Sequence, residues 1–393
     1  MPEAVIVSAV RTPIGRAPKG ALSTTRPEDL AALAVRGALD RVPELSRAEI
    51  DDVILGCAQP EGEQGWNVAR WAALRAQLPV EVPGVTVNRL CASGLEAIVQ
   101  ADLRIRAGGD SVVVAGGVES MSLLPFGGLK PSPNPWLAEH YPAALITMGL
   151  TAERVARHYS VSRADQDAFA LASHKKALAA QAAGRFAEEL IPVAITSAVP
   201  GANAGKPTVT ESIFAADEGP RADSSLEALA KLKPAFHAQG TVTAGNSSQT
   251  SDGAAAAVLM EAGRARELGI RPLARLVAYA ATGCLPEEMG IGPVSAIRKV
   301  LRRAGFTLAD IGLIELNEAF AAQALAVIRE LGLDPERINV NGGAIALGHP
   351  LGCTGAKLTA TLLNEMRRRQ LHYGMVTMCV GGGMGAAAIF ELL

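Results

Sequence analysis

Residues 85–103 of this chain read VTVNRLCASGLEAIVQADL and combine a short strand, a turn and a helix. The strand part is rich in β-branched residues, and the apolar residues from Leu95 onward recur with the helical period. Ser93 and Glu96 have the spacing of a capping box, which predicts that the helix begins just after Cys91. A strand that runs directly into a helix is typical of α/β proteins.

The place of Cys91 in this stretch predicts a nucleophile. A cysteine at the start of a helix faces unpaired N–H groups and the positive end of the helix dipole. Both favour the thiolate, which is the form that attacks carbonyl carbons. An inert buried cysteine is the alternative, and it is the more frequent role of an isolated cysteine.

Similar strand and helix patterns continue on both sides of this stretch. Short apolar runs occur at 5–7, 53–55 and 111–115, and helical patterns lie between them at 27–41 and 93–107. This alternation predicts an α/β protein with buried sheets.

The last third of the chain repeats the same order of patterns. Residues 48–56 resemble 309–317, and residues 112–115 resemble 376–379, with offsets of 261 and 264. Two nearly equal offsets predict an internal duplication into two similar α/β halves.

The section between the two halves, 122–244, has a different composition. It is rich in Pro and Gly up to residue 142, and a charged helix is predicted over 163–183, with Ser162 at its start and Asp165 three residues on. We expect an insertion that covers one face of the core, after which 254–260 returns as a strand of the first half.

A second cysteine, Cys379, closes a predicted strand and is followed by three glycines, 381–383. Such a run is costly in conformational entropy, and it is explained if backbone N–H groups must face a developing negative charge. A dinucleotide-binding loop is excluded, because Ala386 replaces the third glycine and 387–392 reads as a strand. A tight β-turn remains the alternative.

Two further polar residues lie in similar surroundings. His349 is followed by Pro350 within a glycine-rich loop, where a phosphate-binding loop would need Lys and Ser or Thr. A histidine there can act as the base for a thiol or as a donor to an oxyanion. Asn317 follows a predicted strand and can hydrogen-bond a water or a substrate, with a helix N-cap as the alternative.

Charge and cysteine content exclude several other classes. The net charge is −2 without a basic block, which argues against nucleic-acid binding. The five cysteines are scattered, which argues against a disulfide scaffold or a metal site and predicts a reducing compartment, the cytoplasm. The strand predicted from Ala4 leaves no room for a signal peptide, and no apolar run reaches the roughly 18–20 residues of a membrane span.

Together these loops resemble the thiolase family over essentially the whole chain. The segments that carry the resemblance are RTPIG at 11–15, VNRLCASG at 87–94, NEAF at 317–320, GHP at 348–350 and CVGGGMG at 379–385. The implied fold is α/β with five α-β-α-β-α layers, made from two duplicated halves that each hold a mixed five-stranded sheet. The implied domains are an N-terminal half at 1–121 and 245–270, a loop domain at 122–244 over the active site and CoA, and a C-terminal half at 271–393.

The resemblance also implies catalytic roles. Cys91 would carry the acyl group, and His349 would take its proton and help hold the thioester oxygen. Cys379 would be the general acid and base. Asn317 would hold a water beside His349 in one oxyanion hole, and the N–H groups of Cys91 and Gly381 would form the other.

The substrate contacts implied by the resemblance are fewer. Ser248 would contact the pantetheine of CoA, Arg221 would lie near its adenine nucleotide, and Met148 and Phe320 would line an apolar pocket. Thr147 replaces the histidine of the acetoacetyl-specific biosynthetic members, which favours a degradative 3-ketoacyl-CoA thiolase.

The implied activity is thiolytic cleavage of 3-ketoacyl-CoA, with CoA as co-substrate, no permanently bound cofactor and no metal. The implied assembly is a homodimer or homotetramer. A biosynthetic acetyl-CoA C-acetyltransferase is the first alternative. More distant alternatives are a decarboxylating ketoacyl synthase, a hydroxymethylglutaryl-CoA synthase and a non-catalytic CoA-binding protein. The decarboxylating synthases would place a second histidine at Asn317 and usually lack a cysteine at Cys379.

Overall fold

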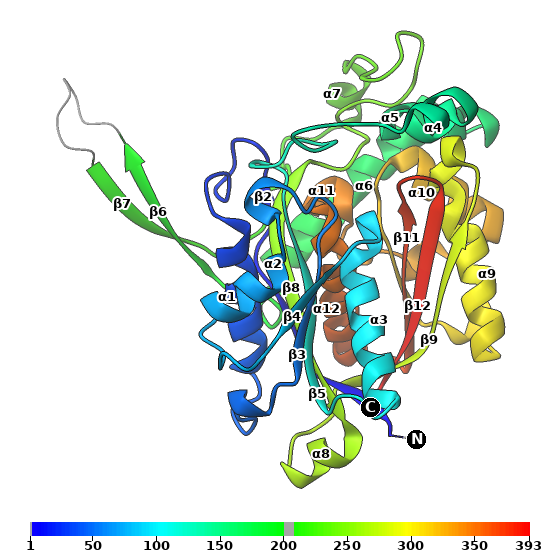
Figure 1. The fold of residues 1–393 in the computed structure, drawn as a ribbon. Coiled ribbons are helices and arrows are strands. Elements are labelled where there is room, and N and C mark those ends of the chain that lie inside the picture. Colours follow the sequence, from blue (N-terminus) through cyan, green and yellow to red (C-terminus); the bar gives the residue numbers. More distant parts are fainter. Residues whose placement is uncertain (1, 200–207) are drawn as a thin grey trace.

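The computed structural model describes residues 2–199 and 208–393. Helices and sheets alternate across the molecule in five layers (Figure 1). Helices α3 and α12 pack together in the centre. Helices α1 and α2 cover the outer face of one sheet, and α9 and α10 cover that of the other. The bounds are α1 Pro27–Leu39, α2 Val68–Arg75, α3 Ser93–Arg106, α9 Gly292–Ala304, α10 Ala321–Leu331 and α12 Leu351–Arg369.

The sheet of the first half has the strand order β4-β3-β5-β8-β1. Strand β3 runs parallel to β4 and β5, and β8 runs antiparallel to β5 and β1, so the sheet is mixed and five-stranded as expected. The short β2 also pairs with β8. The bounds are β1 Ala4–Arg11, β2 Gly15–Arg16, β3 Asp52–Gly56, β4 Gly84–Val87, β5 Val112–Ser120 and β8 Ser251–Glu261.

The sheet of the second half has the order β10-β11-β12-β9, and it joins the first sheet through a single residue pair of β1 and β9, Ile6 with Ala274. Strands β10 and β11 are parallel, and β12 runs antiparallel to β11 and β9. A fifth strand would lie beside β10 and run parallel to it. In its place the structure has a single parallel bridge, between Ile314 and Ile338. The bounds are β9 Ala274–Gly283, β10 Leu313–Leu316, β11 Tyr373–Val380 and β12 Met384–Leu392.

Each sheet is apolar on both faces because helices cover both. In β3, Val53 and Leu55 pack among residues of α1 and α2, whereas Ile54 packs among residues of α3 and α12. Successive side chains of a strand point to opposite faces, so one short apolar strand serves two cores. This explains why the strands read as continuous apolar runs.

The duplication is confirmed, and the strand register corrects one of its offsets. Val53 pairs with Val114 in the first half, and Ile314 pairs with Met375 in the second. Both differences, 314 minus 53 and 375 minus 114, are 261. The expected offset of 264 for the second strand is therefore wrong. A shift by three positions, an odd number, would turn its core residues to the opposite face, whereas Val114 and Met375 both pack against outer helices.

Residues of the expected insertion lie across one end of the layers, where α4, α5 and α7 are seen at the top of Figure 1. The Ser162 hydroxyl accepts from the Asp165 N–H at 3.1 Å and so begins α6, as predicted. Strands β6 and β7 form a separate hairpin that projects from the body (Figure 1). The bounds are α4 Pro135–His140, α5 Met148–His158, α6 Arg163–Ala182, β6 Val193–Val199, β7 Thr208–Phe214 and α7 Leu226–Ala230, with α8 Ala262–Glu267 and α11 Ala344–Leu347 elsewhere.

Within residues 2–199 and 208–393, no helix has the length and apolar character needed to cross a membrane.

Candidate active site

The turn that holds Cys91 is tight and is fixed by polar side chains. Leu90 has a φ of +45°, a left-handed conformation that is unfavourable for a residue with a side chain. Asn88 Oδ1 accepts from the Leu90 N–H at 2.7 Å. Ser93 Oγ accepts from the Arg89 N–H at 2.9 Å and donates to the Leu90 carbonyl at 2.6 Å. These bonds hold Cys91 between β4 and α3.

The predicted capping box at this turn is wrong. Helix α3 begins at Ser93 itself, with Ala92 before it, and no side chain caps its N–H groups. The Ser93 hydroxyl is used by the turn, and Glu96 accepts from Arg89 at 2.7 Å and from the Tyr279 hydroxyl at 2.6 Å. The spacing of a capping box is present, but tertiary partners use both side chains.

The glycine run after Cys379 makes a turn and also faces Cys91. Gly382 and Gly383 have φ values of +77° and +84°, which glycine adopts at no steric cost. A Cβ on Gly381 would lie 3.0 Å from Leu90 Cδ1, so a side chain there would press on the Cys91 turn. The Gly381 N–H faces the Cys91 sulfur closely enough to lower the pKa of the Cys91 thiol. The turn and the N–H donor are therefore both present.

The loop around His349 is held by its backbone and by both ring nitrogens. The His349 N–H lies 3.1 Å from Ser251 Oγ. Nε2 lies 3.3 Å from Asn317 Nδ2, and Nδ1 lies 2.6 Å from Thr354 Oγ1. His349 is buried, and its backbone N–H and both ring nitrogens therefore all have polar neighbours.

Asn317 comes to His349 from the neighbouring strand end. Its N–H donates to the Thr377 carbonyl at 2.9 Å, which fixes it beside β11. It is not a helix N-cap, because α10 begins at Ala321 and Phe320 precedes it. Its buried Oδ1 has no hydrogen-bond partner among the described residues, so it can accept from a water or a substrate.

The two cysteines meet from opposite halves of the chain. Strand β11, whose end carries Cys379, contacts the turn Leu90–Ala92 that holds Cys91, and a negative charge on Cys91 would raise the pKa of Cys379. Cys91 also packs against an apolar cluster of Ala58, Met121 and Leu351, and Leu351 lies two residues beyond His349. Loops from both halves therefore converge on Cys91.

The Cys91 thiol is protonated in the resting site. Burial raises the pKa of the Cys91 thiol to about 11, and Glu119 acts in the same direction. The N–H groups of Gly381 and of Cys91 itself lower the pKa but are outweighed. The N–H groups favour the thiolate as expected, but desolvation at this turn exceeds their effect.

The other two titrating groups are also neutral. Burial raises the pKa of Cys379 well above its usual value, and Cys91 adds to this rise. Burial lowers the pKa of His349 to about 3, and the Lys357 ammonium adds to this fall. The resting site holds two thiols and a neutral imidazole, so a proton must leave Cys91 before it can attack.

Cys379 belongs to an apolar cluster. It contains Met289, Ala319, Phe320 and the partly buried Met148. Two of its members, Met148 and Phe320, were expected in an apolar pocket. Met289 was not expected from the sequence, where a methionine before Gly290 gives no signal that distinguishes it from a core residue.

The two residues expected to contact CoA have fewer contacts with the site than the catalytic residues have. The Ser248 N–H donates to the Ala319 carbonyl at 2.9 Å, beside the apolar cluster. Arg221 is exposed on the inserted segment, where its N–H donates to His174 Nδ1 at 3.2 Å. Ser248 therefore borders the site, whereas the described contacts of Arg221 are with His174.

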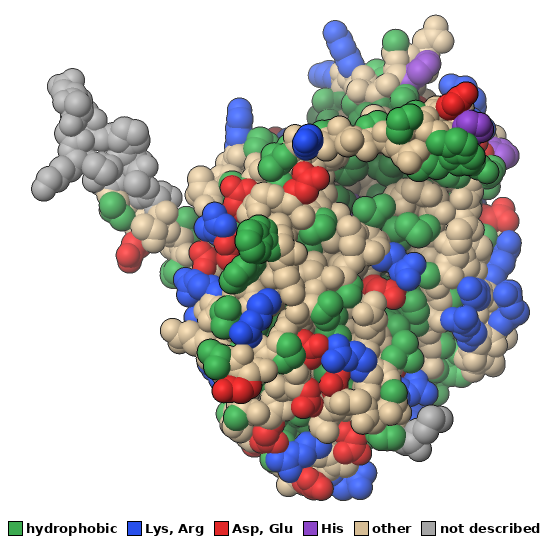
Figure 2. Space-filling model, viewed as in Figure 1, with side chains coloured by type: hydrophobic (Ala, Val, Ile, Leu, Met, Phe, Trp, Pro, Cys, Tyr) green, Lys and Arg blue, Asp and Glu red, His purple; other side chains and the backbone are tan. Residues whose placement is uncertain are grey.

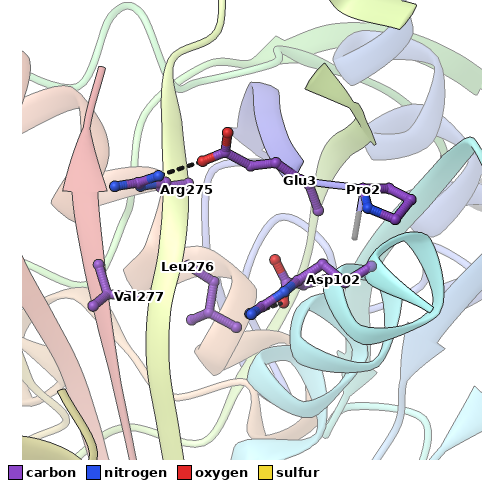
Figure 3. A pocket seen from close by; sticks show the side chains of 8 residues that line it. Pro2, Glu3, Asp102, Arg275, Leu276 and Val277 are labelled. Atoms are coloured by element: carbon purple, nitrogen blue, oxygen red, sulfur yellow. Dashed lines mark hydrogen bonds and ion pairs between the residues drawn. The ribbon is translucent and has the colours of Figure 1, made fainter. Parts of the chain in front are cut away.

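The cavity in Figure 3, of about 400 Å³, is not part of this site. It lies near the N-terminus between α3 and β9, lined by Glu3, Asp102, Arg106 and Arg275 among others. Arg275 pairs with Glu3, and Arg106 pairs with Asp102. Its charges already have partners. Among the described residues, no three His, Cys, Asp or Glu side chains gather where they could hold a metal ion.

The site brings together two thiols, an imidazole and an amide at strand ends of a duplicated five-layer fold. These features define a class of acyl-transferring enzymes. Residues 4–263 match the N-terminal domain of thiolase, and residues 270–392 match its C-terminal domain. The chain belongs to the thiolase family.

The similar proteins indicate which kinds of thiolase this chain resembles. The chain is 54% identical over 392 residues to the 3-ketoacyl-CoA thiolase of Bacillus subtilis (strain 168), and the match covers all of both chains. It is 48% identical over 396 residues to the 3-ketoacyl-CoA thiolase of Cronobacter sakazakii, again over both full lengths. Its fold matches the crystal structure of the Bacillus anthracis acetyl-CoA acetyltransferase with a TM-score of 0.88 and 43% identity, over 100% of this chain and 99% of that chain.

Proposed function

We propose that the chain is a 3-ketoacyl-CoA thiolase, which uses CoA to cleave a 3-ketoacyl-CoA into acetyl-CoA and a shortened acyl-CoA. The observation that carries the proposal is that Cys91, faced by the Gly381 N–H, shares one site with a second thiol, the buried Cys379. One thiol can hold the acyl group while the other moves protons. CoA is a co-substrate here and not a resident cofactor.

In the first step the Cys91 proton passes to His349, and the thiolate attacks carbon 3 of the substrate. The N–H groups of Cys91 and Gly381 stabilise the oxyanion. The bond between carbons 2 and 3 then breaks, and its electron pair forms the enolate of acetyl-CoA. Cys379 gives its proton to carbon 2, which leaves Cys379 as a thiolate and Cys91 as a thioester.

In the second step the Cys379 thiolate removes the proton of incoming CoA. The CoA thiolate attacks the acyl group on Cys91, and the oxyanion of this same carbonyl is held again by the N–H groups of Cys91 and Gly381. His349 with a water at Asn317 serves the other oxygen, that of the acetyl-CoA enolate in the first step. Cys91 leaves as a thiolate and recovers its proton from His349, so all groups return to their neutral state. Run in reverse, the same steps perform a Claisen condensation.

Replacing Cys379 by alanine should separate the two roles. We expect an enzyme that still becomes acylated at Cys91 but turns over about 10²–10⁴-fold more slowly, because the general acid and base is lost. The acyl enzyme can be measured by intact mass and turnover by loss of 3-ketoacyl-CoA absorbance. Cys284→Ala is the matched control, since this half-buried thiol acts electrostatically on Cys379. Wild-type turnover by Cys379→Ala would contradict the role of Cys379.

The biosynthetic acetyl-CoA C-acetyltransferase remains the second candidate, because the similar B. anthracis structure carries that name. Thr147 and the 3-ketoacyl-CoA thiolase relatives favour the degradative reaction. A panel of 3-ketoacyl-CoA substrates from four carbons upward distinguishes the two. Activity confined to the four-carbon substrate would favour the acetyltransferase.

We also propose that the chain forms a dimer through the free edge of β4. The edge carries Val85, and the adjoining α2 region carries two exposed tryptophans, Trp66 and Trp71, with Trp66 exposed to 91%. Hydrophobic side chains are visible at the surface over α2 in Figure 2. An open strand edge beside large apolar side chains fits a second copy of the same chain.

The hairpin β6–β7 suits a second contact that joins two dimers. Its base is anchored by Val193 in the core, whereas Ile213, which pairs with the next residue Ala194, is exposed to 68%. Val209, near the other end of the pair, is exposed to 59%. A lone two-stranded hairpin is marginally stable in water. Docking on another copy would therefore stabilise it.

Light scattering after gel filtration tests this assembly. The wild type should have four times the chain mass, and Ile213→Lys should stop at the dimer. Trp66→Asp should abolish the edge contact, and Asp suits the φ of +60° at this position. A monomeric wild type, or two variants with wild-type mass, would refute the proposed contacts.

The remaining assignments follow from the same function. Residues 122–244 would act as the loop domain over CoA, with Ser248 at the pantetheine and Arg221 near the nucleotide. The five cysteines of the chain are all unpaired, which supports a reducing cytoplasmic location.

A further inference from the structure

Thr354 contacts His349 from the first turn of α12. Its side chain is fully buried, and its Oγ1 lies 2.6 Å from His349 Nδ1. The same hydroxyl donates to the Pro350 carbonyl at 2.9 Å, one turn back along the chain. Thr354 therefore bridges the imidazole to the backbone of the His349 loop.

The direction of these bonds defines a tautomer. A hydroxyl has one hydrogen to donate, and here it goes to Pro350. Thr354 can then only accept from His349, so the ring hydrogen must be on Nδ1. The lone pair of Nε2 is left on the side of Asn317, whose Nδ2 is a donor at 3.3 Å. This arrangement satisfies both bonds of the Thr354 hydroxyl, and the long 3.3 Å contact from Asn317 is given up when Nε2 takes a proton.

The charges around His349 keep this imidazole neutral until it receives a proton. The hydroxyl of Thr354 is a neutral partner, unlike the carboxylate that supports histidine in Ser-His-Asp sites. Lys357 is buried one turn farther along α12, and its positive charge disfavours the imidazolium. The groups on the other packed elements, Cys91 and Cys379, are thiols at rest.

We propose that Thr354 is a positioning residue, which holds His349 as the Nδ1–H tautomer so that Nε2 can accept the proton of Cys91. This inference rests on the proposed role of His349 as the base for Cys91. The ring is thereby prepared before substrate arrives, and after proton transfer Nε2–H becomes a donor for the thioester oxygen.

Thr354→Val tests the proposal because it keeps the shape of the side chain and removes the hydroxyl. We expect the rate of Cys91 acylation to fall by about 10²-fold, the lower range of a general-base effect, with KM unchanged. Alkylation of Cys91 by iodoacetamide below pH 8 should slow in parallel, and the difference from wild type should shrink at high pH, where the thiol ionises without a base. Thr354→Ser should restore both rates.

Thr359→Val is the matched control. Thr359 is buried in the same helix and donates to Gly355 at 2.8 Å with the same spacing, but it does not bond His349. Wild-type acylation by Thr354→Val, or equal losses in the Thr354 and Thr359 variants, would overturn the proposal. If Thr354→Val does not fold, Thr354→Ala replaces it in the same comparison.

His349→Asn separates the inference from the function on which it rests. If this variant acylates at the wild-type rate, His349 is not the base and the proposed mechanism fails. If it loses acylation while Thr354→Val keeps it, only the positioning role of Thr354 is refuted.

Discussion

Replacing Cys91 by serine is expected to lower kcat for thiolysis by about 10⁴-fold or more. A hydroxyl is harder to ionise than a thiol, and the neutral imidazole of His349 is a weak base for it. The acyl group would have no other acceptor in the site, because Cys379 is proposed to move protons only. Turnover is followed by loss of 3-ketoacyl-CoA absorbance, and the acyl enzyme by intact mass.

Cys353→Ala is the matched control for this prediction. Cys353 is buried among apolar residues between the central helices, and it should be inert. We expect this variant to keep kcat within a few-fold of the wild type. A Cys91→Ser enzyme with wild-type turnover would end the assignment of Cys91 as the nucleophile. A wild type that iodoacetamide cannot alkylate at Cys91 at alkaline pH would favour a non-catalytic CoA-binding protein.

Replacing Arg11 by methionine is expected to cause the largest loss of stability. The guanidinium is fully buried, with Nε 2.6 Å from Glu189 and its two terminal nitrogens 2.7 and 2.9 Å from the two oxygens of Asp217. Burial lowers the pKa of Arg11, but the two carboxylates outweigh burial and hold it above the usual value. Without Arg11, two buried carboxylates would lack their partner.

The expected cost is about 3–5 kcal/mol, the usual result of breaking a buried ion pair on one side. Glu189 and Asp217 lie in the inserted segment and Arg11 ends β1, so the loss should also loosen this segment from the core. The apparent Tm at one fixed heating rate is the measurement, since many large chains unfold irreversibly. Asp217→Asn is a milder variant, useful if Arg11→Met is insoluble.

The exposed pair of Arg75 and Asp29 provides the control. Its nitrogen and oxygen are 2.5 Å apart, but the side chains are 53% and 39% exposed. Arg75→Met should cost about 0–1 kcal/mol, because water already screens both charges. Equal changes in Tm for Arg11→Met and Arg75→Met would show that burial does not increase the contribution of the Arg11 ion pairs to stability.

Much of the site was predictable because it depends on short segments. The strand before Cys91, the turn at 381–383 and the rigid loop at His349 each follow from neighbouring residues. Their conformations are local, since glycine, proline and β-branched residues restrict the backbone at their own positions. The resemblance of these segments to one family then joined them into one site.

The capping box and the second repeat offset failed for a different reason. Ser93 and Glu96 had the right spacing, but Leu90, Arg89 and Tyr279 provided better partners. The offset of 264 matched similar letters, whereas pairing with β10 and packing on the outer helices require 261. Both features depend on contacts with distant parts of the chain.

The sequence by itself determined the family, the two α/β halves, and the identity of the two thiols, the histidine and the asparagine. Tertiary structure alone decided their protonation and their partners. A pKa near 11 for Cys91 and near 3 for His349 comes from burial by residues far away in the chain. The bond from His349 to Thr354 likewise exists only once Pro350 turns the chain into α12. Solvent exclusion and hydrogen-bond direction are properties of the folded arrangement, and no single segment contains them.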